Sequence, residues 1–413
     1  MVINAEFKDI FFRHAHKIKI VENELSIDKN TILTNIKDIK QVTFEVTQDC
    51  NLRCKYCIFN SDAYPYHRKP SPLYMEFDNA KKVIDYIAGF ISGRKNKTLS
   101  IGFYGGEPLL NFKFIEQMVE LSKSIFYGWE LIFTITTNGT RLTDTNIHFF
   151  IENHFRLLVS LDGPEKNHDS KRVFPDGTGS FRIIKRNLEK IKSINEKYFT
   201  DNVTFSAVFS RDMSLEKVYR FFASSHLVNK NEINFGSVSE AFTTYYDEFN
   251  YDRLKFQQER ARIFERILNK IREKKKLSAL DTDIVSDYFI MNSALKTRTV
   301  NHLSGTCVFD ARLFVAADGS FHICEKMNDQ FPIGSVEKGF DYPRMIDIVH
   351  EYAALVKETC FDCEARFLCK RCYARFARDG KFEINNEYCK NVRKSLKKRL
   401  EELVKLNEEG FNS

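Results

Sequence analysis

The chain has 413 residues, of which 43% are hydrophobic and 29% charged, which is typical of a globular enzyme with one large and one smaller domain. Its net charge of +7 is spread along the sequence, so we expect no nucleic-acid partner. The sequence has no apolar run long enough to span a bilayer and no secretory apolar segment near Met1, so we expect no membrane association and a cytoplasmic location.

The ten cysteines are unevenly distributed along the chain. Three fall between Cys50 and Cys57, and the other seven fall between Cys307 and Cys389. In a reducing cytoplasm, clustered cysteines indicate metal or redox chemistry rather than disulfides. The long interval without cysteine therefore predicts two separate metal regions.

Residues 1–40 form an N-terminal extension with two short β-like runs, Ile10–Phe12 and Ile18–Val21, for which a hairpin is a candidate. Residues 41–240 then alternate six apolar, β-rich stretches with segments that mostly carry apolar residues at helical spacing. This alternation indicates parallel β/α units, and six units are too few for a closed eight-stranded barrel. The predicted fold class is α/β, a partial (β/α)6 TIM-like barrel. The expected strands are Val42–Val46, Leu99–Tyr104, Leu131–Thr136, Leu157–Leu161, Val203–Phe209 and Ile233–Val238, and the expected helices include Ala80–Ile91, Phe112–Ile125, Phe181–Ile194 and Leu215–Phe222.

Residues 241–300 are expected to form a helical bridge, because Tyr251–Lys276 carries an apolar stripe at helical spacing that is typical of core packing. Residues 301–413 are expected to form a small cysteine-rich α+β domain, with short strands at Leu313–Ala316 and Phe321–Ile323. The basic run Lys390–Arg399 lies on a predicted C-terminal amphipathic helix, and we interpret it as a solvated face.

Cys50, Cys54 and Cys57 follow the first barrel strand at C-x3-C-x2-C spacing. This position is the carboxyl-terminal mouth of the barrel, where such folds place their chemistry. Three thiolates can hold three irons of a four-iron cluster that ordinarily takes four cysteines, so one iron would stay open to an outside ligand. The alternative is a zinc site or three buried thiols. Zinc favours four ligands in paired C-x2-C spacing, and His67, ten residues on, is interpreted as a loop residue.

Three further motifs follow the next three strands, namely Gly105-Gly106-Glu107-Pro108, Thr137-Asn138-Gly139 and Ser160-Leu161-Asp162-Gly163-Pro164. Together with the cysteine motif, which has an aromatic residue before its last cysteine, they resemble the radical S-adenosylmethionine (SAM) superfamily. In that family the amino and carboxylate groups of the methionine moiety chelate the open iron. An electron from the cluster then breaks the sulfonium bond and leaves a 5′-deoxyadenosyl radical.

The resemblance implies roles for individual residues around SAM. Gly105 and Gly106, in the motif completed by Pro108, let the backbone approach the ligand, and Glu107 pairs with its ammonium group. The other candidate contacts are Tyr56 for adenine, Asn138 and Ser160 for the ribose or carboxylate, and Arg172 for the carboxylate.

The second cysteine region runs from Cys307 and Cys324 through a C-x2-C-x5-C-x2-C array to Cys389. A zinc ribbon would separate its two pairs by about 15–20 residues. The array instead resembles the SPASM extension of peptide-modifying radical enzymes, which carries two auxiliary four-iron clusters. The x2 gap between Cys369 and Cys372 departs from the more common x3.

The same resemblance divides the seven thiols into two ligand sets. The outer cluster would take Cys360, Cys363, Cys369 and Cys389, and the inner cluster Cys307, Cys324 and Cys372. Seven thiolates cannot fill eight sites, so the inner cluster takes another ligand or keeps an open iron. An open iron could bind and deprotonate a substrate cysteine.

Glu325 directly follows Cys324, where the related sulfatase maturases have an aspartate that acts in deprotonation. It is a candidate catalytic base or substrate ligand, and the alternative is a plain surface charge.

We therefore expect an enzyme with SAM and three four-iron clusters that abstracts hydrogen from a ribosomally made precursor peptide and forms thioether crosslinks. The alternatives are an anaerobic sulfatase-maturating enzyme, which makes formylglycine, and a multi-cluster electron-transfer protein. The expected partners are the precursor peptide and an electron donor such as flavodoxin or ferredoxin. A leader-binding domain is expected to be absent, truncated or supplied by a separate protein, and strand addition to Ile10–Val21 is a further candidate for leader recognition.

Overall fold

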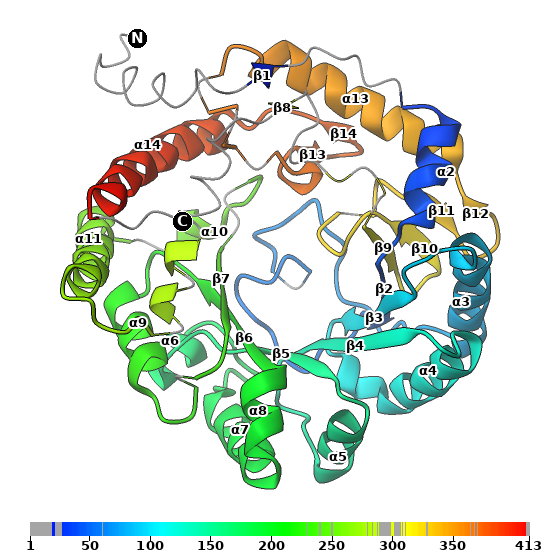
Figure 1. The fold of residues 1–413 in the computed structure, drawn as a ribbon, viewed down its shortest axis with the longest axis horizontal. Helices are drawn as coiled ribbons and strands as arrows, with labels where there is room; N and C mark the ends of the chain where they lie inside the picture. The colour runs from blue at the N-terminus through cyan, green and yellow to red at the C-terminus, as the bar shows by residue number, and fades with distance from the viewer. Residues whose placement is uncertain are drawn as a thin grey trace.

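The computed structural model gives the fold for most of the chain beyond the N-terminal extension (Figure 1). The described residues are 19–20, 27–59, 61–228, 230–238, 241–248, 251–278, 280–282, 284–286, 288, 299–300, 307, 309, 311–327, 329–363, 365–366, 368–369 and 371–409.

Six parallel strands form the central part of the sheet and confirm the predicted partial barrel. Each predicted strand is present within one or two residues of its expected ends. The strands are β2 (Gln41–Thr47), β3 (Thr98–Gly105), β4 (Glu130–Thr137), β5 (Arg156–Ser160), β6 (Val203–Phe209) and β7 (Ile233–Ser237).

Helices lie along the outer rim of the molecule, with the strands inside them (Figure 1). They form where apolar residues recur every three or four positions, so that α3 buries Ala80, Val83 and Ile87 against the sheet. The helices are α2 (Lys29–Lys37), α3 (Phe77–Ile91), α4 (Phe112–Ile125), α5 (Asp144–Glu152), α6 (Glu165–Asp169), α7 (Phe181–Ile194), α8 (Glu196–Asn202), α9 (Leu215–Ser224), α10 (Tyr245–Glu248), α11 (Arg253–Arg272), α13 (Tyr342–Cys360) and α14 (Asn386–Glu408).

The cysteine-rich region continues the barrel sheet. Strand β9 (Arg312–Val315) pairs in parallel with β2, and β10 (Ser320–His322), β11 (Gly334–Ser335) and β12 (Gly339–Phe340) add to it as antiparallel strands. The sheet therefore has ten strands in the order β12-β11-β10-β9-β2-β3-β4-β5-β6-β7. The prediction of a separate small domain missed this continuity.

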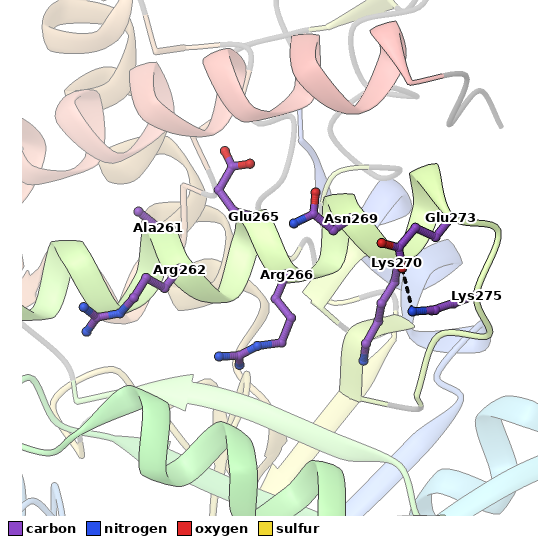
Figure 2. Close-up of a pocket in the computed structure, with 8 residues that line it drawn as sticks. All are labelled: Ala261, Arg262, Glu265, Arg266, Asn269, Lys270, Glu273 and Lys275. Carbon is purple, nitrogen blue, oxygen red and sulfur yellow. Dashed lines mark ion pairs between the residues drawn. The ribbon is translucent and has the colours of Figure 1, made fainter.

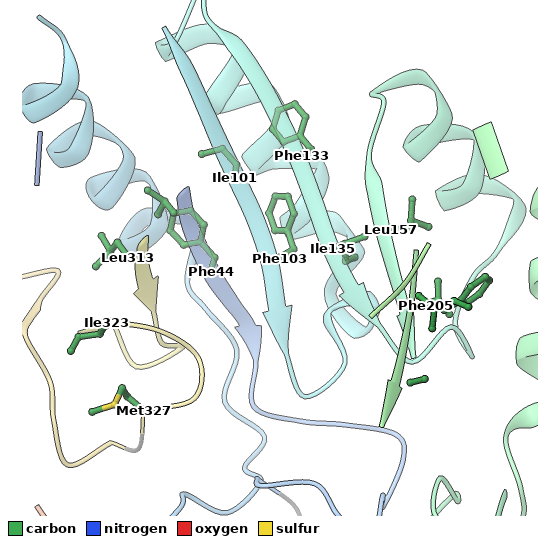
Figure 3. Packing of buried hydrophobic residues seen from close by; sticks show 14 of the residues in the cluster. Phe44, Ile101, Phe103, Phe133, Ile135, Leu157, Phe205, Leu313, Ile323 and Met327 are labelled. Carbon is green, nitrogen blue, oxygen red and sulfur yellow. The ribbon is translucent and has the colours of Figure 1, made fainter. Parts of the chain in front are cut away.

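The hydrophobic core is also shared between the two regions. Figure 3 shows Phe44 of β2 near Leu313 of β9, with Ile323 and Met327 beyond it and Phe103 on the other side. All five side chains belong to one cluster of buried residues. A common core fixes the cysteine-rich region relative to the mouth of the barrel.

The predicted helical bridge contains α11, whose buried residues include the predicted Ile263 and Ile267. The C-terminal helix α14 packs beside it, and the buried Glu402 of α14 accepts hydrogen bonds from Arg260 (2.5 Å) and Tyr288 (2.6 Å). These contacts connect the two ends of the open sheet through helices.

The N-terminal extension lies mostly outside the described residues, including the predicted run Ile10–Phe12. Lys19–Ile20 (β1) pairs in parallel with Thr299–Val300 (β8), so these two residues take part in a long-range pairing. Among the helices that the structure describes, none combines the length and apolar character needed to cross a membrane.

Two glycines let the end of β3 dock against the loop that follows β2. A Cβ on Gly105, whose φ is +140°, would lie 2.3 Å from the carbonyl oxygen of Thr47. A Cβ on Gly106 would lie 1.9 Å from the carbonyl oxygen of Asp49. The Gly106 N–H donates to Thr47 O (2.8 Å) and the Glu107 N–H to Asp49 O (2.9 Å). The two glycines therefore make this backbone contact possible. The sequence interpretation explains them only by the approach of the backbone to the ligand.

We predict that Gly106→Ala destabilises the fold by about 1–3 kcal/mol or more, because the new methyl group meets backbone rather than a flexible side chain. The matched control is Gly89→Ala in α3, where a Cβ has nothing within 4 Å and alanine favours the helix. Anaerobic thermal unfolding of the full chain should show a lower midpoint for the first variant only. Equal midpoints for Gly106→Ala and the unmodified chain would contradict the account.

Candidate active site

The loop after β2 carries Cys50, Cys54 and Cys57 at the carboxyl end of the sheet. Within the loop, the Cys57 N–H donates to Cys54 O (3.1 Å). The loop is tied to a second segment, because the Arg53 N–H donates to Val173 O (2.7 Å) and the Lys55 N–H to Lys171 O (3.0 Å). The three thiols are therefore held between the end of β2 and the segment that follows α6.

The three thiols lie close enough to affect one another electrostatically. Burial first and then the charge of Glu107 raise the pKa of Cys50 to about 12, with smaller contributions from Cys54 and Cys57 and an opposing one from the hydrogen bond of Leu52. Burial also raises the pKa of Cys54 to about 12, although Arg172 opposes the shift. Without a bound metal these thiols would be neutral at pH 7, so thiolates here require positive charge such as iron.

A four-iron cluster fits this donor set. Among the residues that the structure describes, no three Cys, His, Asp or Glu side chains converge as they would on a single metal ion. A four-iron cluster requires no such convergence, since each thiolate binds a different iron. Hydrogen-bond donors already face the sulfurs: Leu52 N lies 3.4 Å and Asn138 Nδ2 4.0 Å from Cys50 Sγ.

Glu107 follows β3, contacts the end of β4 through its side chain and contacts the loop after β2 through its backbone N–H. Its side chain is fully buried and accepts hydrogen bonds from Leu109 N (3.1 Å), Thr137 Oγ1 (2.7 Å) and Asn138 N (2.7 Å). Burial raises its pKa to about 6, although these hydrogen bonds oppose the shift. Pairing with the ammonium group of SAM stays a prediction. The buried Pro108 begins the short 3-10 helix (Pro108–Asn111) that follows.

Asn138 and Ser160 both lie at strand ends, and Asn138 contacts the cysteine loop. Asn138 follows β4, and its Nδ2 donates to Asn51 Oδ1 (2.9 Å) inside the loop. Ser160 is the last residue of β5 and is 9% exposed. The structure brings both residues to the predicted edge of the sheet, and their contacts with SAM remain predictions.

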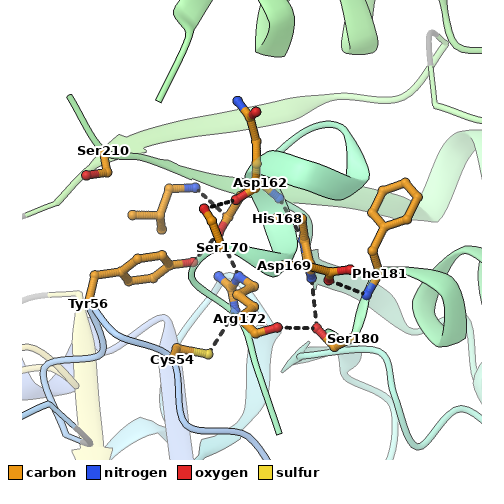
Figure 4. A network of polar contacts seen from close by, with 12 residues as sticks. Cys54, Tyr56, Asp162, His168, Asp169, Ser170, Arg172, Ser180, Phe181 and Ser210 are labelled. Carbon is orange, nitrogen blue, oxygen red and sulfur yellow. Dashed lines mark hydrogen bonds and ion pairs between the residues drawn. The ribbon is translucent and has the colours of Figure 1, made fainter. Parts of the chain in front are cut away.

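Tyr56, Asp162 and Arg172 form a buried network that sequence reasoning recognised only in part (Figure 4). Asp162 Oδ2 accepts hydrogen bonds from the Tyr56 hydroxyl and from Arg172 Nε (2.9 Å), and its Oδ1 accepts one from Val208 N (2.9 Å). The Arg172 guanidinium also lies 5.3 Å from the centre of the Tyr56 ring. In the sequence, Asp162 stands out only as part of a motif, and nothing local indicates that its side chain joins three segments.

Arg172 was predicted to bind the SAM carboxylate, and the structure places it against protein groups. Besides Asp162, its Nη1 lies 3.9 Å from Cys54 Sγ. The whole residue is only 7% exposed.

The neutral His168 connects two parts of this network through hydrogen bonds to Asp162 and Ser180. His168 Nδ1 accepts from the Asp162 N–H (3.2 Å), so the ring proton is assigned to Nε2, which donates to Ser180 Oγ (2.9 Å). Ser180 Oγ in turn donates to the carbonyl oxygen of Arg172 (2.9 Å). Burial lowers the pKa of His168 to about 3, which keeps the ring neutral.

Burial and neighbouring thiols raise the pKa of cysteines in the second region. The pKa of Cys369 is raised to about 11 by burial first and then by Cys363, Cys360 and Cys389. The pKa of Cys324 is raised to about 12 by burial and Glu325, with a further contribution from Cys372. The pKa of Tyr388 is raised by burial first, and Cys369, Cys372 and Cys389 all raise it further. The division into two ligand sets stays a prediction.

Tyr104, the second-to-last residue of β3, packs against Phe314 of β9, with ring centres 6.3 Å apart. Burial raises its pKa first, and the next contributions come from Glu325 and Cys57. The charge of Glu325, beside Cys324, therefore acts on Tyr104, whose pKa also responds to Cys57 in the first cysteine loop. Glu325 is half-buried, and its catalytic role stays a prediction.

A separate pocket lies on the outer side of the molecule (Figure 2). Its lining comes from α11 and the turn after it, and contains Arg262, Glu265, Arg266 and Glu273. These charges find partners nearby, as in the Arg266–Glu216 (2.7 Å) and Lys275–Glu273 (2.7 Å) pairs. The pocket contains none of the predicted site residues.

We predict that His168 makes stability depend on pH between about 6.5 and 3. Its folded pKa is lower than its unfolded value, so the unfolded chain binds more protons in this window and stability falls as pH falls. His168→Asn lacks this titrating group. The slope of its unfolding free energy against pH should therefore be smaller by up to one proton, which is about 1.4 kcal/mol per pH unit.

Anaerobic unfolding midpoints measured from pH 7 to pH 5 would test this. The two curves should converge as pH falls, whereas parallel curves would contradict a buried neutral His168.

Comparisons with known proteins agree with this geometry. Residues 44–222 match the family described as the radical SAM superfamily. The chain is 28% identical over 270 residues to the radical SAM cyclopropyl synthase TigE of Paramaledivibacter caminithermalis, a match over 60% of this chain and 53% of that protein. It is 23% identical over 362 residues to the cysteine-type anaerobic sulfatase-maturating enzyme of Clostridium perfringens strain 13, covering 83% of this chain and 91% of that enzyme.

The fold agrees with the solved structure of native anSMEcpe with bound AdoMet. The TM-score is 0.66 at 20% identity, over 89% of this chain and 98% of that one. The family match over residues 44–222 supports SAM and a four-iron cluster as cofactors of the barrel. Residues 44–222 of this chain therefore form a radical SAM domain, and the chain is a homologue of the anaerobic sulfatase-maturating enzymes and of a radical SAM cyclopropyl synthase.

Proposed function

We propose that this enzyme cleaves SAM reductively and uses the 5′-deoxyadenosyl radical to abstract hydrogen from a ribosomally made precursor peptide, forming a thioether between a cysteine sulfur and a carbon. The single observation that carries this proposal is that the cysteine-rich region continues the barrel sheet, because β9 pairs in parallel with β2, the strand that precedes the loop of Cys50, Cys54 and Cys57. Tyr104 of β3 also packs against Phe314 of β9, with ring centres 6.3 Å apart.

The first site supports the radical-forming step. Cys50, Cys54 and Cys57 would hold a four-iron cluster, which would supply the electron that breaks the sulfonium bond and an open iron for the methionine end of SAM. The chain's own contribution is to bury Leu52, Cys54 and Tyr56 of this loop and to fix the loop through the backbone of Gly106 and Glu107. Burial excludes water from a site where a carbon radical would otherwise be lost to side reactions.

The second site supports the sulfur chemistry. Cys307, Cys324 and Cys372 supply three thiols, so a four-iron cluster there has a position for a further ligand. A substrate cysteine in that position would be deprotonated by the metal, and the cluster would accept the electron that is released when the sulfur closes onto the substrate carbon radical. Glu325 would hold the substrate or accept its proton.

Oxidation of cysteine to formylglycine is the second candidate. It is favoured by the sulfatase-maturating relative, which aligns over 91% of its own length. Against it, a glutamate stands beside Cys324 where those enzymes have aspartate. A multi-cluster electron carrier would not need the buried strand-end motifs around Glu107 and Asp162. The further proposed partners are an electron donor such as flavodoxin or ferredoxin and a separate leader-binding protein.

Mass spectrometry distinguishes these reactions. The reconstituted full chain would be incubated anaerobically with SAM, dithionite and cysteine-containing peptides encoded beside its gene, and the products treated with a thiol-alkylating reagent. We predict a loss of two hydrogens per bridge and of one alkylatable thiol. A loss of two hydrogens with every thiol still alkylated would indicate carbon–carbon bond formation. Replacement of sulfur by an aldehyde oxygen would indicate formylglycine, and either result would overturn the thioether proposal.

We further predict that Glu325→Gln lowers the yield of modified peptide by about 100-fold or more if Glu325 is the base. Its iron content and its peptide-independent formation of 5′-deoxyadenosine should stay as in the unmodified chain. The matched control is Glu337→Gln, since Glu337 is exposed in the turn between β11 and β12. Equal peptide modification by both variants would show that Glu325 is a surface charge.

A further inference from the structure

Arg172 stands out because a charged side chain this deeply buried contacts a proposed cluster ligand. Its Nη1 lies 3.9 Å from Cys54 Sγ, and Cys54 is itself only 9% exposed (Figure 4). Two other guanidinium contacts, the ion pair with Asp162 and the face of the Tyr56 ring, fix its direction. The side chain therefore cannot swing away from the sulfur without leaving the Asp162 carboxylate unpaired.

The surrounding residues hold this arrangement from several elements. Asp162 is tied to β6 through Val208 N, and the backbone of Arg172 is tied to Ser180. The neutral His168 joins these two anchors. So many fixed contacts to one cation indicate a role that depends on its position and charge.

We propose that Arg172 is a positioning residue that tunes the first cluster, donating a hydrogen bond to the Cys54 thiolate and raising the reduction potential of the cluster. The inference rests on the radical SAM domain but requires no particular peptide substrate. Hydrogen bonds to cluster sulfurs and nearby net charge both set the potential of such clusters. Reduction adds one electron to the cluster, and a fixed cation beside one ligand stabilises the added negative charge.

This role differs from the one that the motif resemblance suggested. A contact with the SAM carboxylate would be expected to affect SAM affinity, whereas a contact with Cys54 should affect the potential before SAM binds. The geometry agrees with the second role, because Arg172 Nη1 lies 3.9 Å from Cys54 Sγ while Arg172 Nε is held by Asp162 at 2.9 Å.

The test is a redox titration of the full reconstituted chain, with dithionite as reductant and electron paramagnetic resonance as readout. The part of the reduced signal that changes on addition of SAM reports the cluster with an open iron and so separates it from any auxiliary cluster. SAM affinity is measured in parallel by equilibrium binding to the oxidised protein. The matched control is Arg182→Gln, since Arg182 has an 85% exposed side chain and lies outside this network.

Arg172→Gln should shift the midpoint potential to a more negative value and leave SAM affinity within about twofold of the unmodified chain. Arg172→Lys keeps the positive charge but loses the planar guanidinium. Its midpoint potential should therefore lie between those of Arg172→Gln and the unmodified chain. If Arg172→Gln does not fold, the double variant Arg172→Gln, Asp162→Asn removes the buried pair together and should still shift in the same direction. An unchanged potential in the variant that folds would overturn the proposal. A tenfold loss of SAM affinity together with that unchanged potential would assign Arg172 to the SAM carboxylate instead.

Discussion

The site depends on close contact between the backbone of the cysteine loop and the end of the neighbouring strand. Thr47 and Asp49 accept hydrogen bonds from Gly106 and Glu107, at a distance that leaves no room for side chains at the two glycines. The Glu107 carboxylate then extends the connection to β4 through Asn138. Three adjacent strands are thereby locked together at their carboxyl ends, and the three thiols are carried on this rigid edge.

A second layer of buried polar groups completes the other side of the loop. Asp162 and Arg172 come from the segment after β5, and they contact Tyr56 and Cys54 within the loop itself. Burying an ion pair is costly unless its remaining hydrogen-bonding groups also find partners. Here the Val208 N–H and the Tyr56 hydroxyl both donate to the Asp162 carboxylate, so the buried carboxylate has partners besides Arg172. Polar networks of this kind fix a single arrangement more firmly than apolar packing does.

The relation between the two cysteine regions follows from the sheet. Because β9 pairs in parallel with β2, the residues that follow both strands meet at the same edge. Glu45 of β2 strengthens this junction by accepting a hydrogen bond from Ala317 N (2.9 Å) just beyond β9. Phe314 of β9 also contacts Tyr104 of β3, with ring centres 6.3 Å apart, so the cysteine-rich region packs against the strand that precedes Glu107.

Much of this architecture could be predicted from the sequence, because apolar periodicity and strand-end motifs are local. The predicted ends of the six barrel strands lie within one residue of the observed ends, and the predicted bounds of α4 and α7 are the observed ones. The pairing of β9 with β2 could not be predicted, since nothing in Arg312–Val315 specifies a partner about 270 residues earlier.

The same limit applies to the site. Gly106 was recognised by its motif, but its steric reason lies in Asp49, and the three-way role of Asp162 appears only once β6 and the cysteine loop are in place.

The most direct test of the central claim is whether these three thiols hold a cluster that cleaves SAM. The full chain and its Cys54→Ala variant would be reconstituted anaerobically, reduced with dithionite and supplied with SAM, and iron and 5′-deoxyadenosine would be measured. We predict that the unmodified chain forms 5′-deoxyadenosine and that the variant loses about four irons and all of this product. An iron-free chain, or equal amounts of 5′-deoxyadenosine from both proteins, would contradict the account.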